Sequence, residues 1–262
     1  MVVVNVNDDN FYLDGYLKSN LDLLSQSLKK DYDFFIVIDG RERFGKSTLA
    51  SQIAYYLDPT YNLDRCVFTA DQFAEAVEKA EKFQAIVFDE AHGYLGSRSS
   101  MSSFNKKLVK IMTEMGSKNL IVILCLPNFF ELDKYPAIWR SSCLLHVHQR
   151  GRFCFYNYKK KQDLYLKGKR FYAYNVSANF HGCFIKFFPL DKEEYENKKL
   201  VSVAEHVKTN SKELRYSRQI NNLLEYIKKN MDVSQEELAK VMGITQQAVG
   251  RRIFQGNSDK IQ

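Results

Sequence analysis

The sequence has no hydrophobic run that is long enough to cross a membrane. Its most apolar run, Leu120 to Leu126, is far shorter than the roughly 20 residues that a transmembrane helix needs. Met1 to Val4 also lack the basic start and the long apolar core of a signal peptide. We therefore expect a cytoplasmic protein without membrane insertion.

Cysteine is scarce and scattered. The five cysteines form an odd number, and none of them belongs to a Cys-x-x-Cys pair. This pattern argues against a disulfide framework and against a structural zinc site, and it fits a reducing compartment.

Charge is plentiful, with a basic excess. The chain of 262 residues has a formal net charge of +7 and a pI near 9.0. Such a balance favours an acidic partner, and nucleic acid is the commonest one, although overall charge alone does not identify it. The 45% of hydrophobic residues are enough for the core of one medium domain and a second, small one.

The most informative stretch begins with a short apolar run. Phe34 to Ile38 is typical of a buried parallel strand, and the residues after it match the pattern G-x-x-x-x-G-K-[ST] at each defined position. A chance match in a glycine turn is the alternative, but the apolar spacing behind the motif predicts a helix and makes chance a poor explanation. The motif consists of Gly40, Arg41, Glu42, Arg43, Phe44, Gly45, Lys46, Ser47 and Thr48.

Each defined residue of this motif has a chemical role in holding a phosphate. Gly40 and Gly45 let the backbone curl so that successive N–H groups point at phosphate oxygens, and the helix that starts near Lys46 adds its positive dipole end. Lys46 is expected to reach the β- and γ-phosphates of a nucleotide, and Ser47 is expected to offer its hydroxyl to Mg²⁺.

A second apolar run ends in two adjacent acids. Asp89 and Glu90 follow the expected strand Gln84 to Phe88, at the sheet edge where the phosphate loop also lies. Asp89 is placed to hold Mg²⁺ through water, and Glu90 is placed to orient and deprotonate a water that attacks the γ-phosphate. Solvated acids at an ordinary strand end are the alternative, which the single strand and helix between Lys46 and Asp89 disfavour.

The other segments of this region alternate between helical and strand patterns. We expect helices over residues 13–30 and 71–81, and strands over residues 66–69 and 119–127. This rhythm predicts an α/β fold with a mainly parallel sheet flanked by helices.

Together, residues 40–48 and Ile86 to Glu90 resemble the Walker A and Walker B motifs of the additional-strand, catalytic-glutamate group of P-loop ATPases. That group includes RecA-like motors, DNA pumps and AAA+ proteins. Within it, the stretches Ser97–Arg98, Asn119–Asn128 and Leu144–His148 resemble phage- and plasmid-borne ATPases related to zonula occludens toxin-like and FtsK-like proteins. The likeness covers roughly residues 30–190 and is specific only at the two Walker motifs. It implies a P-loop NTPase fold, ATP and Mg²⁺ as cofactors, and assembly into a homo-oligomer.

The resemblance implies further roles. Asn128 is similar to the polar sensor that touches the γ-phosphate or the attacking water, with an ordinary turn asparagine as the alternative. Arg98 and Arg140 are the candidates for an arginine finger, which such ATPases often take from a neighbouring subunit. Arg43 and Phe44 depart from relatives that often have small residues there, and Arg43 either slows hydrolysis or holds phosphate in its own way.

From Leu144 onward the pattern changes to the alternation that is typical of strands. We expect Leu144 to His148 to join the main sheet, and a β-meander to occupy residues 144–188, with a strand over residues 163–166. His146 and His148 share one face of the first strand, a spacing that can bind metal. Without a nearby acid or thiol cluster in the sequence, a structural role is favoured for both.

The segment from Arg150 to Arg170 combines positive charge with aromatic residues. It holds eight basic residues against one acid. Such a segment can grip a phosphate backbone and stack bases, which makes single-stranded DNA a possible partner. Lysines also protect exposed edge strands, so a purely structural role is the alternative.

The last part of the chain predicts a separate domain. Residues 207–213 are polar and unpatterned, and we expect them to link a P-loop ATPase domain, residues 1–206, to a small all-α helix-turn-helix domain, residues 214–262. Ser234 to Glu237 has the pattern of a capping box, and Gly243 suits the turn. The helix before them is expected to bury Ile220, Leu223, Leu224 and Ile227.

The helix after Gly243 carries the residue types that read double-stranded DNA. Gln246, Gln247 and Arg251 are expected to face the major groove, and Arg252 is expected to meet a phosphate. Ten basic and six acidic side chains between residue 207 and the end of the chain favour DNA. A small trihelical domain that docks a protein is the alternative.

The sequence leaves three classes of function open. The first is an Mg²⁺-dependent ATPase that acts on DNA as a motor or switch, in replication, packaging or maintenance of a virus- or plasmid-type element. The second is a nucleotide-gated, DNA-binding transcriptional regulator with little turnover. The third, an assembly ATPase of the zonula occludens toxin type, would need a transmembrane segment that this sequence lacks.

Overall fold

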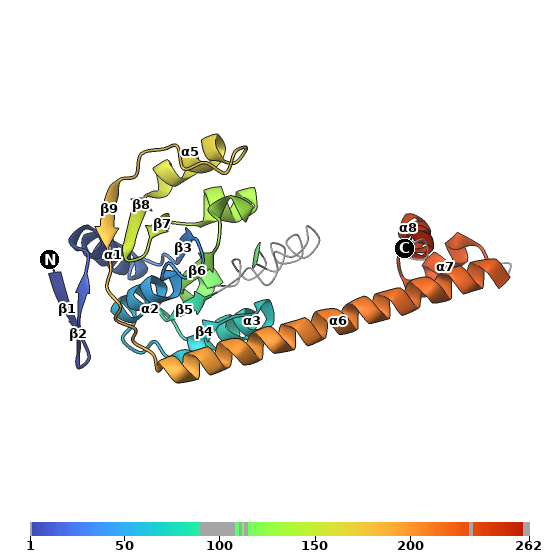
Figure 1. Ribbon diagram of the computed structural model, residues 1–262, viewed down its shortest axis with the longest axis horizontal. Coiled ribbons are helices and arrows are strands. Elements are labelled where there is room, and N and C mark those ends of the chain that lie inside the picture. The colour runs from blue at the N-terminus through green and yellow to red at the C-terminus, as the bar shows by residue number, and fades with distance from the viewer. Residues whose placement is uncertain (1, 90–107, 110–111, 113–114, 231–232, 259–262) are drawn as a thin grey trace. The chain divides into compact units, whose positions relative to one another are not determined.

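The chain divides into two compact units, Met1–Val203 and Ala204–Gln262. Each unit has hydrophobic core of its own. The computed structural model, drawn in Figure 1, describes residues 2–89, 108–109, 112, 115–230 and 233–258.

The first unit is built on a seven-stranded sheet. From one edge to the other, the order of strands is β4 (Cys66–Val67), β5 (Ala85–Phe88), β6 (Ile121–Leu126), β3 (Phe34–Gly40), β7 (Cys143–Gln149), β8 (Arg152–Tyr156) and β9 (Phe180–Cys183). Neighbours from β4 to β7 are parallel, whereas β8 and β9 continue the sheet antiparallel. The predicted α/β architecture with a mainly parallel sheet is confirmed. As expected, β7 joins this sheet, and it lies beside β3.

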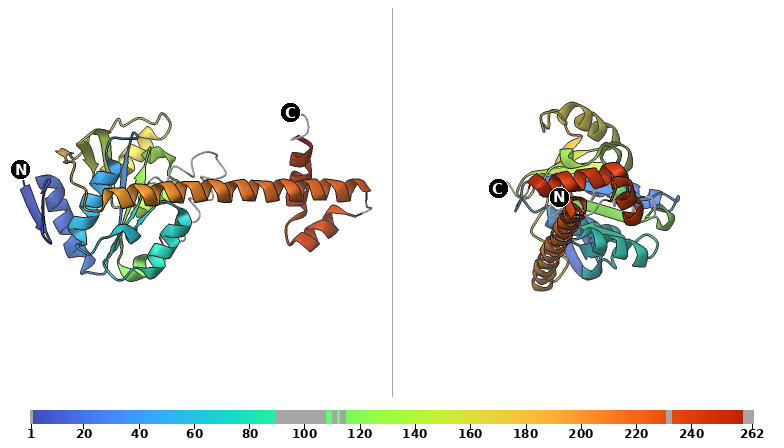
Figure 2. Two further views of the ribbon diagram at one scale, coloured as in Figure 1. Left: turned by 60° about the horizontal axis from the view of Figure 1, so that its bottom comes forward. Right: turned by 90° about the vertical axis from the view of Figure 1, so that its right-hand side faces the viewer.

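Helices cover both faces of this sheet (Figure 1, Figure 2). The helices are α1 (Gly15–Leu28), α2 (Lys46–Leu57), α3 (Ala70–Lys79), α5 (Tyr158–Gly168) and α6 (Lys192–Asn230), with short helical turns η1 (Leu63–Arg65), η3 (Met115–Lys118), η4 (Phe129–Glu131) and η5 (Tyr135–Arg140). Along β3, Ile36 and Ile38 pack toward α1 and α2, and Phe35 and Val37 pack toward α3 and α5. Because both faces are covered, β5 and β6 are apolar throughout, and β3 is apolar from Phe34 to Ile38.

The N-terminal residues form a hairpin that the sequence did not predict. Its strands are β1 (Val2–Val6) and β2 (Asp9–Leu13). Asp14 separates the hairpin from α1, because its side chain accepts hydrogen bonds from the N–H groups of Tyr16 and Leu17 at 3.0 and 3.1 Å and so caps the helix. The helix predicted over residues 13–30 therefore began too early.

Part of the β-meander predicted over residues 144–188 is helical. Helix α5 includes residues 163–166, for which a strand was predicted. Its first turn is capped by Asn157, which accepts a hydrogen bond from the Lys160 N–H at 3.0 Å. Burial then follows the helical spacing of three and four rather than the alternation of a strand, at Lys161, Leu164, Tyr165 and Gly168.

Residues 207–213, predicted as an unpatterned linker, lie inside α6, and the chain divides into its two units between Val203 and Ala204. The sequence between Pro189 and Gly243 contains neither glycine nor proline, and it is rich in lysine and glutamate, which favour helices. The polar composition of residues 207–213 therefore belongs to a polar part of α6 and does not indicate an interruption of the helix. Among the described helices, none is at once long enough and apolar enough to cross a membrane.

The second unit combines the end of α6 with two further helices, α7 (Gln235–Met242) and α8 (Gln246–Ser258). Its core consists of Leu224, Leu238, Ala239 and Val249. Ser234 and Glu237 form the predicted capping box, and Gly243 turns the chain with a φ of 63°. Ile220 and Leu223 were predicted to face inward, but they are 38% and 58% exposed, so the buried stripe of this helix is narrower than predicted.

Candidate functional site

The loop between β3 and α2 depends on two glycines. Gly40 has a φ of +139°, and a Cβ on it would lie 2.2 Å from the carbonyl oxygen of Val147 on β7. Gly45 has a φ of +95° and occupies the N-cap position of α2. Because glycine has no side chain, the first N–H groups of α2 receive no cap from this residue. Because the first N–H groups of a helix have no intrahelical partners, this end of α2 is suited to binding an anion.

Two larger residues of this loop are accommodated in different ways. Arg43 adopts a left-handed φ of 61°, a backbone conformation that residues other than glycine adopt only with strain. Its side chain is exposed. Phe44 packs against the core on the α1 and α2 face. Thr48 is half-buried in the first turn of α2. The departures from small residues therefore cost backbone strain at one position and add burial at the next.

Lys46 lies over the loop. Its Nζ donates to the carbonyl oxygens of Gly40 and Arg41 at 2.7 and 2.9 Å. These acceptors hold the ammonium group beside the uncapped N-terminus of α2, so two sources of positive potential occur at one place. The arrangement can bind an anion if the lysine exchanges these two carbonyl oxygens for the oxygens of a phosphate.

Asp89, directly after β5, is fully buried and contacts α6. Its carboxylate accepts a hydrogen bond from the hydroxyl of Tyr195. Burial raises the pKa of Tyr195, the charge of Asp89 and the hydrogen bond to it raise this pKa further, and a hydrogen bond with Ser47 acts in the opposite direction. Asp89 and Ser47, one from each of the two motifs, therefore both influence the pKa of the Tyr195 hydroxyl.

Asp39, the residue before Gly40, is a second buried acid at this edge of the sheet. One carboxylate oxygen lies 2.9 Å from Nδ1 of His146, and the other accepts hydrogen bonds from the Phe129 N–H at 2.9 Å and from the Tyr174 hydroxyl. Burial, followed by the charge of Asp39, raises the pKa of Tyr174. Asp39 therefore ties the end of β3 to the segments that follow β6 and α5, and to β7.

Asn128, the candidate sensor, lies just after β6. Its Oδ1 accepts a hydrogen bond from the Phe130 N–H at 2.9 Å and caps η4. The intervening residue, Phe129, is held by Asp39, which places this turn beside the end of β3. The contacts described are those of a turn asparagine, and a contact with phosphate stays a prediction.

The structure places one of the two candidate arginine fingers. Arg140 at the end of η5 pairs with the carboxylate of Asp33, with Nη1 and Oδ1 3.1 Å apart. Asp33 precedes β3, so Arg140 lies at the sheet edge opposite to Lys46 and does not join the loop of its own chain. Arg98, the other candidate, and Glu90 lie outside the described residues.

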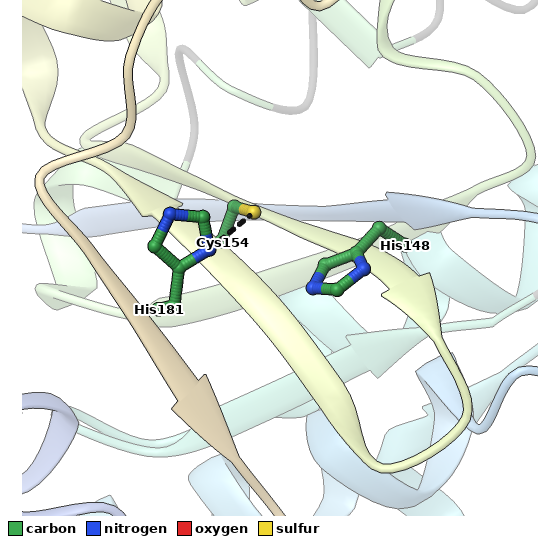
Figure 3. Close-up of side chains that lie close together, drawn as sticks. All are labelled: His148, Cys154 and His181. Carbon is green, nitrogen blue, oxygen red and sulfur yellow. Dashed lines mark hydrogen bonds between the residues drawn. The ribbon is translucent and has the colours of Figure 1, made fainter.

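Another polar cluster lies on the antiparallel part of the sheet. Ligand atoms of His148, Cys154 and His181 are all within 4.8 Å of one another (Figure 3). The pKa of His148 is lowered by burial and then by the charges of neighbouring histidines and Arg152, whereas burial raises the pKa of the Cys154 thiol. The sequence did not predict a thiol near His148, because Cys154 is brought there by strand pairing. His146 instead contacts Asp39.

The basic segment from Arg150 to Arg170 is less accessible than its composition predicts. Its aromatic residues Phe153, Phe155, Tyr156 and Tyr165 are buried in the two cores of the first unit. Lys161 is also buried, and its Nζ donates to the carbonyl oxygens of Ala137, Ile138 and Ser141 at 2.6 to 3.0 Å. Burial lowers the pKa of Lys161 to about 7. Stacking of bases on these four aromatic rings is therefore not supported.

The second unit presents its predicted DNA-contacting residues on α8. Gln246, Gln247 and Arg251 are exposed, and Arg252 is half-buried. Val249, between them in the sequence, is fully buried and anchors α8 to the core of this unit. One side of α8 is thus packed, and its first turn is polar and accessible.

Sequence reasoning missed Asp39, Tyr174 and Tyr195 as parts of the site. The two tyrosines lie 135 and 106 positions from the acids that they contact, and no local pattern marks such pairs. An acid at the end of an apolar run, as in Ile38-Asp39, was the one available signal.

Comparison with protein-family models and with curated proteins finds no match to this chain.

Proposed function

We propose that this protein is an Mg²⁺-dependent ATPase that acts on DNA, as a motor or switch for a virus- or plasmid-type element. One observation carries the proposal: residues from two separate sequence motifs meet at the carboxyl edge of the sheet. Lys46 lies over the loop after β3, Asp89 accepts a hydrogen bond from the hydroxyl of Tyr195, and Ser47 lowers the pKa of that hydroxyl.

The residues at this edge fit a nucleotide and its metal ion. The N-terminus of α2 and the ammonium of Lys46 supply donors and positive charge for phosphates. Ser47 and Asp89 supply a hydroxyl and a carboxylate, the hard oxygen ligands that Mg²⁺ prefers. When bound, the metal ion neutralises charge on the β- and γ-phosphates.

We assign each residue of this site a separate role. Lys46 binds the phosphates, and Ser47 and Asp89 hold the metal ion. Glu90, the residue after Asp89, accepts the proton of the attacking water. Asn128 orients that water or the γ-phosphate. Arg98, or Arg140 from a neighbouring chain in a homo-oligomer, stabilises the transition state.

The strand order supports the same proposal. Strand β6 lies between β3, which leads into the loop, and β5, which leads into Asp89. The carboxyl ends of these parallel strands lie side by side, as ligand sites of open α/β sheets require.

Action on DNA rests on the second unit. The exposed first turn of α8 carries Gln246, Gln247 and Arg251, whose amide and guanidinium groups suit base edges in the major groove of double-stranded DNA. Arg252 suits a phosphate. Several such units in one homo-oligomer would bind DNA together, and weak single contacts would then add up.

A nucleotide-gated DNA-binding regulator with little turnover is the second candidate, and Tyr195 favours it. Helix α6 begins in the first unit and ends in the second. If Asp89 held a metal ion, its carboxylate would be shared between that ion and the Tyr195 hydroxyl. Binding of nucleotide would then act on a helix that belongs to both units, and DNA affinity would depend on nucleotide without repeated hydrolysis.

The deciding experiment measures Mg²⁺-dependent ATP hydrolysis and ATP binding by the full chain. We expect Glu90→Gln to bind ATP but to lose most turnover, because the general base is removed and the phosphate loop stays. Lys46→Ala should weaken binding itself. Glu42→Gln, which removes an exposed carboxylate from the same loop, is the matched control and should keep both properties. Equal hydrolysis by the wild type and Glu90→Gln would remove Glu90 from its role, and a wild type without Mg²⁺-dependent hydrolysis would contradict the proposal.

Measurements with duplex and single-stranded DNA separate the two candidates. Many rounds of DNA-stimulated hydrolysis for each bound site would favour a motor. Tight binding to one palindrome with little turnover would favour the regulator. Mass photometry of the same samples reports whether nucleotide changes the number of chains in the assembly.

A further inference from the structure

Three side chains with metal-binding atoms meet on neighbouring strands of the sheet. His148 is on β7, Cys154 on β8 and His181 on β9, and their ligand atoms lie within 4.8 Å of one another. In a tetrahedral zinc site, bond lengths of about 2.0–2.3 Å place the ligand atoms about 3.3–3.8 Å apart. Sγ of Cys154 and Nδ1 of His181 are 3.2 Å apart, so side-chain shifts of about 1 Å bring the cluster to that geometry.

Strand pairing, and not a loop, positions this cluster. Cys154 and His181 are direct partners in the register of β8 and β9. The register of β7 and β8 shifts between His146 and Gln149, and such an irregularity re-aims the side chain of His148. Figure 3 shows the two imidazole rings on either side of the strand that carries Cys154.

We propose that His148, Cys154 and His181 bind one zinc ion, with water as the fourth ligand. Two imidazole nitrogens and one thiolate are donors that zinc prefers and that Mg²⁺ does not. When the metal binds, the thiol proton of Cys154 passes to solvent and a zinc–sulfur bond replaces the hydrogen bond to His181. Both histidines are exposed, so water reaches the fourth position.

The ion would hold the segment that supports the loop after β3. Strand β9 has four residues and, among the described strands, it pairs with β8 alone. The chain after β9 packs on that loop and on α2: the ring of Phe184 lies 3.0 Å from the place of a Cβ on Gly45. Nε2 of Gln52 donates to the carbonyl oxygens of Ile185 and Phe187 at 2.8 and 2.7 Å. A zinc ion at His181 therefore fixes this support to the sheet.

The test uses the full chain, stripped of metal with a chelator, free of nucleotide and titrated with Co²⁺ as a spectroscopic substitute for zinc. We expect one Co²⁺ per chain, with a thiolate-to-cobalt absorption band that Zn²⁺ removes by displacement. Cys154→Ser should abolish the band. His148→Asn and His181→Asn should each weaken binding by more than about tenfold. Metal binding does not depend on the proposed ATPase activity, so either proposal can fail alone.

Cys183→Ser is the matched control. Cys183 lies on the same strand as His181, and its thiol is free and exposed. This variant should keep the full absorption band. Absence of a thiolate band in the wild type, its persistence in Cys154→Ser or its loss in Cys183→Ser would each overturn the proposal. His148 and His181 are exposed, so their asparagine variants should keep the circular dichroism of the wild type, and unchanged metal affinity in both would also overturn it.

Slower hydrogen exchange of the amides of residues 180–187 in the zinc-bound chain would support the structural role. Equal exchange with and without zinc would refute that role, even if the ion binds.

Discussion

The hydroxyl of Tyr195 donates a hydrogen bond to the carboxylate of Asp89, and both residues are buried. This contact joins the first turns of α6 to the acid that we assign to Mg²⁺. A phenol and a metal ion that use the same carboxylate compete, so nucleotide binding should weaken the hold of α6 on the sheet.

Loss of the Tyr195 hydroxyl should weaken the nucleotide-free chain and increase its response to nucleotide. Tyr195→Phe keeps the ring but removes a donor from a buried carboxylate, which costs about 1–3 kcal/mol. The rise in Tm upon addition of Mg²⁺ and a non-hydrolysable ATP analogue should then exceed that of the wild type. Tyr56→Phe is the control, because it removes a 2.5 Å hydrogen bond to Asp22 that does not involve the loop or Asp89. An equal rise in the wild type and Tyr195→Phe would rule out competition.

Gly40 should not tolerate even the smallest side chain. In Gly40→Ala the new Cβ would lie 2.2 Å from the Val147 carbonyl oxygen, which belongs to a central strand and cannot move aside cheaply. We expect a loss of about 1–3 kcal/mol in the free energy of unfolding, measured with urea. Gly15→Ala, whose nearest neighbour would be 3.5 Å away, should change stability by less than about 0.5 kcal/mol. Similar stabilities of the two variants would show that β7 does not constrain the loop.

Stability should rise with pH through the titration of Lys161. Its pKa is lowered by burial from 10.5 to about 7, so between these values the unfolded chain holds a proton that the folded chain lacks. The free energy of unfolding therefore increases with pH, by at most about 1.4 kcal/mol per pH unit from this group. Urea unfolding between pH 7.5 and 9 should show this slope in the wild type and a smaller one in Lys161→Met. Equal slopes would mean that Lys161 stays protonated in the folded chain.

Two residues of α8 should contribute to DNA binding in different ways. Arg252→Ala should weaken binding to all duplexes alike and flatten the salt dependence, because a phosphate contact is lost. Gln247→Ala should reduce sequence preference, by about 1–3 kcal/mol if a bidentate base contact is lost. Fluorescence anisotropy of the full chain at several salt concentrations measures both effects. Arg152→Ala, in the first unit, is the control. If DNA binding weakened in this variant and in neither α8 variant, the DNA site would have to be assigned to β8.

Local patterns predicted the parts of the fold that local forces decide. β3, β5 and β6 are buried on both faces, so their apolar runs are continuous and easily identified. The cap of α7 and the turn at Gly243 depend on neighbouring residues only. In contrast, residues 163–166 of α5 were predicted as a strand, because the buried side of this helix is set by packing against η5. The polar composition of residues 207–213 concealed a helix.

The site shows the same division. The loop around Lys46 could be proposed from the sequence because its glycines, lysine and serine lie within residues 40–47. Tyr195 at Asp89, and Cys154 and His181 beside His148, depend on which strands and helices become neighbours in space. A single sequence carries no local sign of such neighbours, so these contacts had to come from the structure.

The sheet ends at both edges in very short strands. β4 contributes two residues and β9 four, whereas β3 at the centre has seven. An unpaired strand edge is what recruits strands from other molecules, and its reach grows with its length. Copies of this chain that assemble should therefore be held together by side-chain surfaces, and a continuous sheet running from one copy into the next is disfavoured by the fold itself.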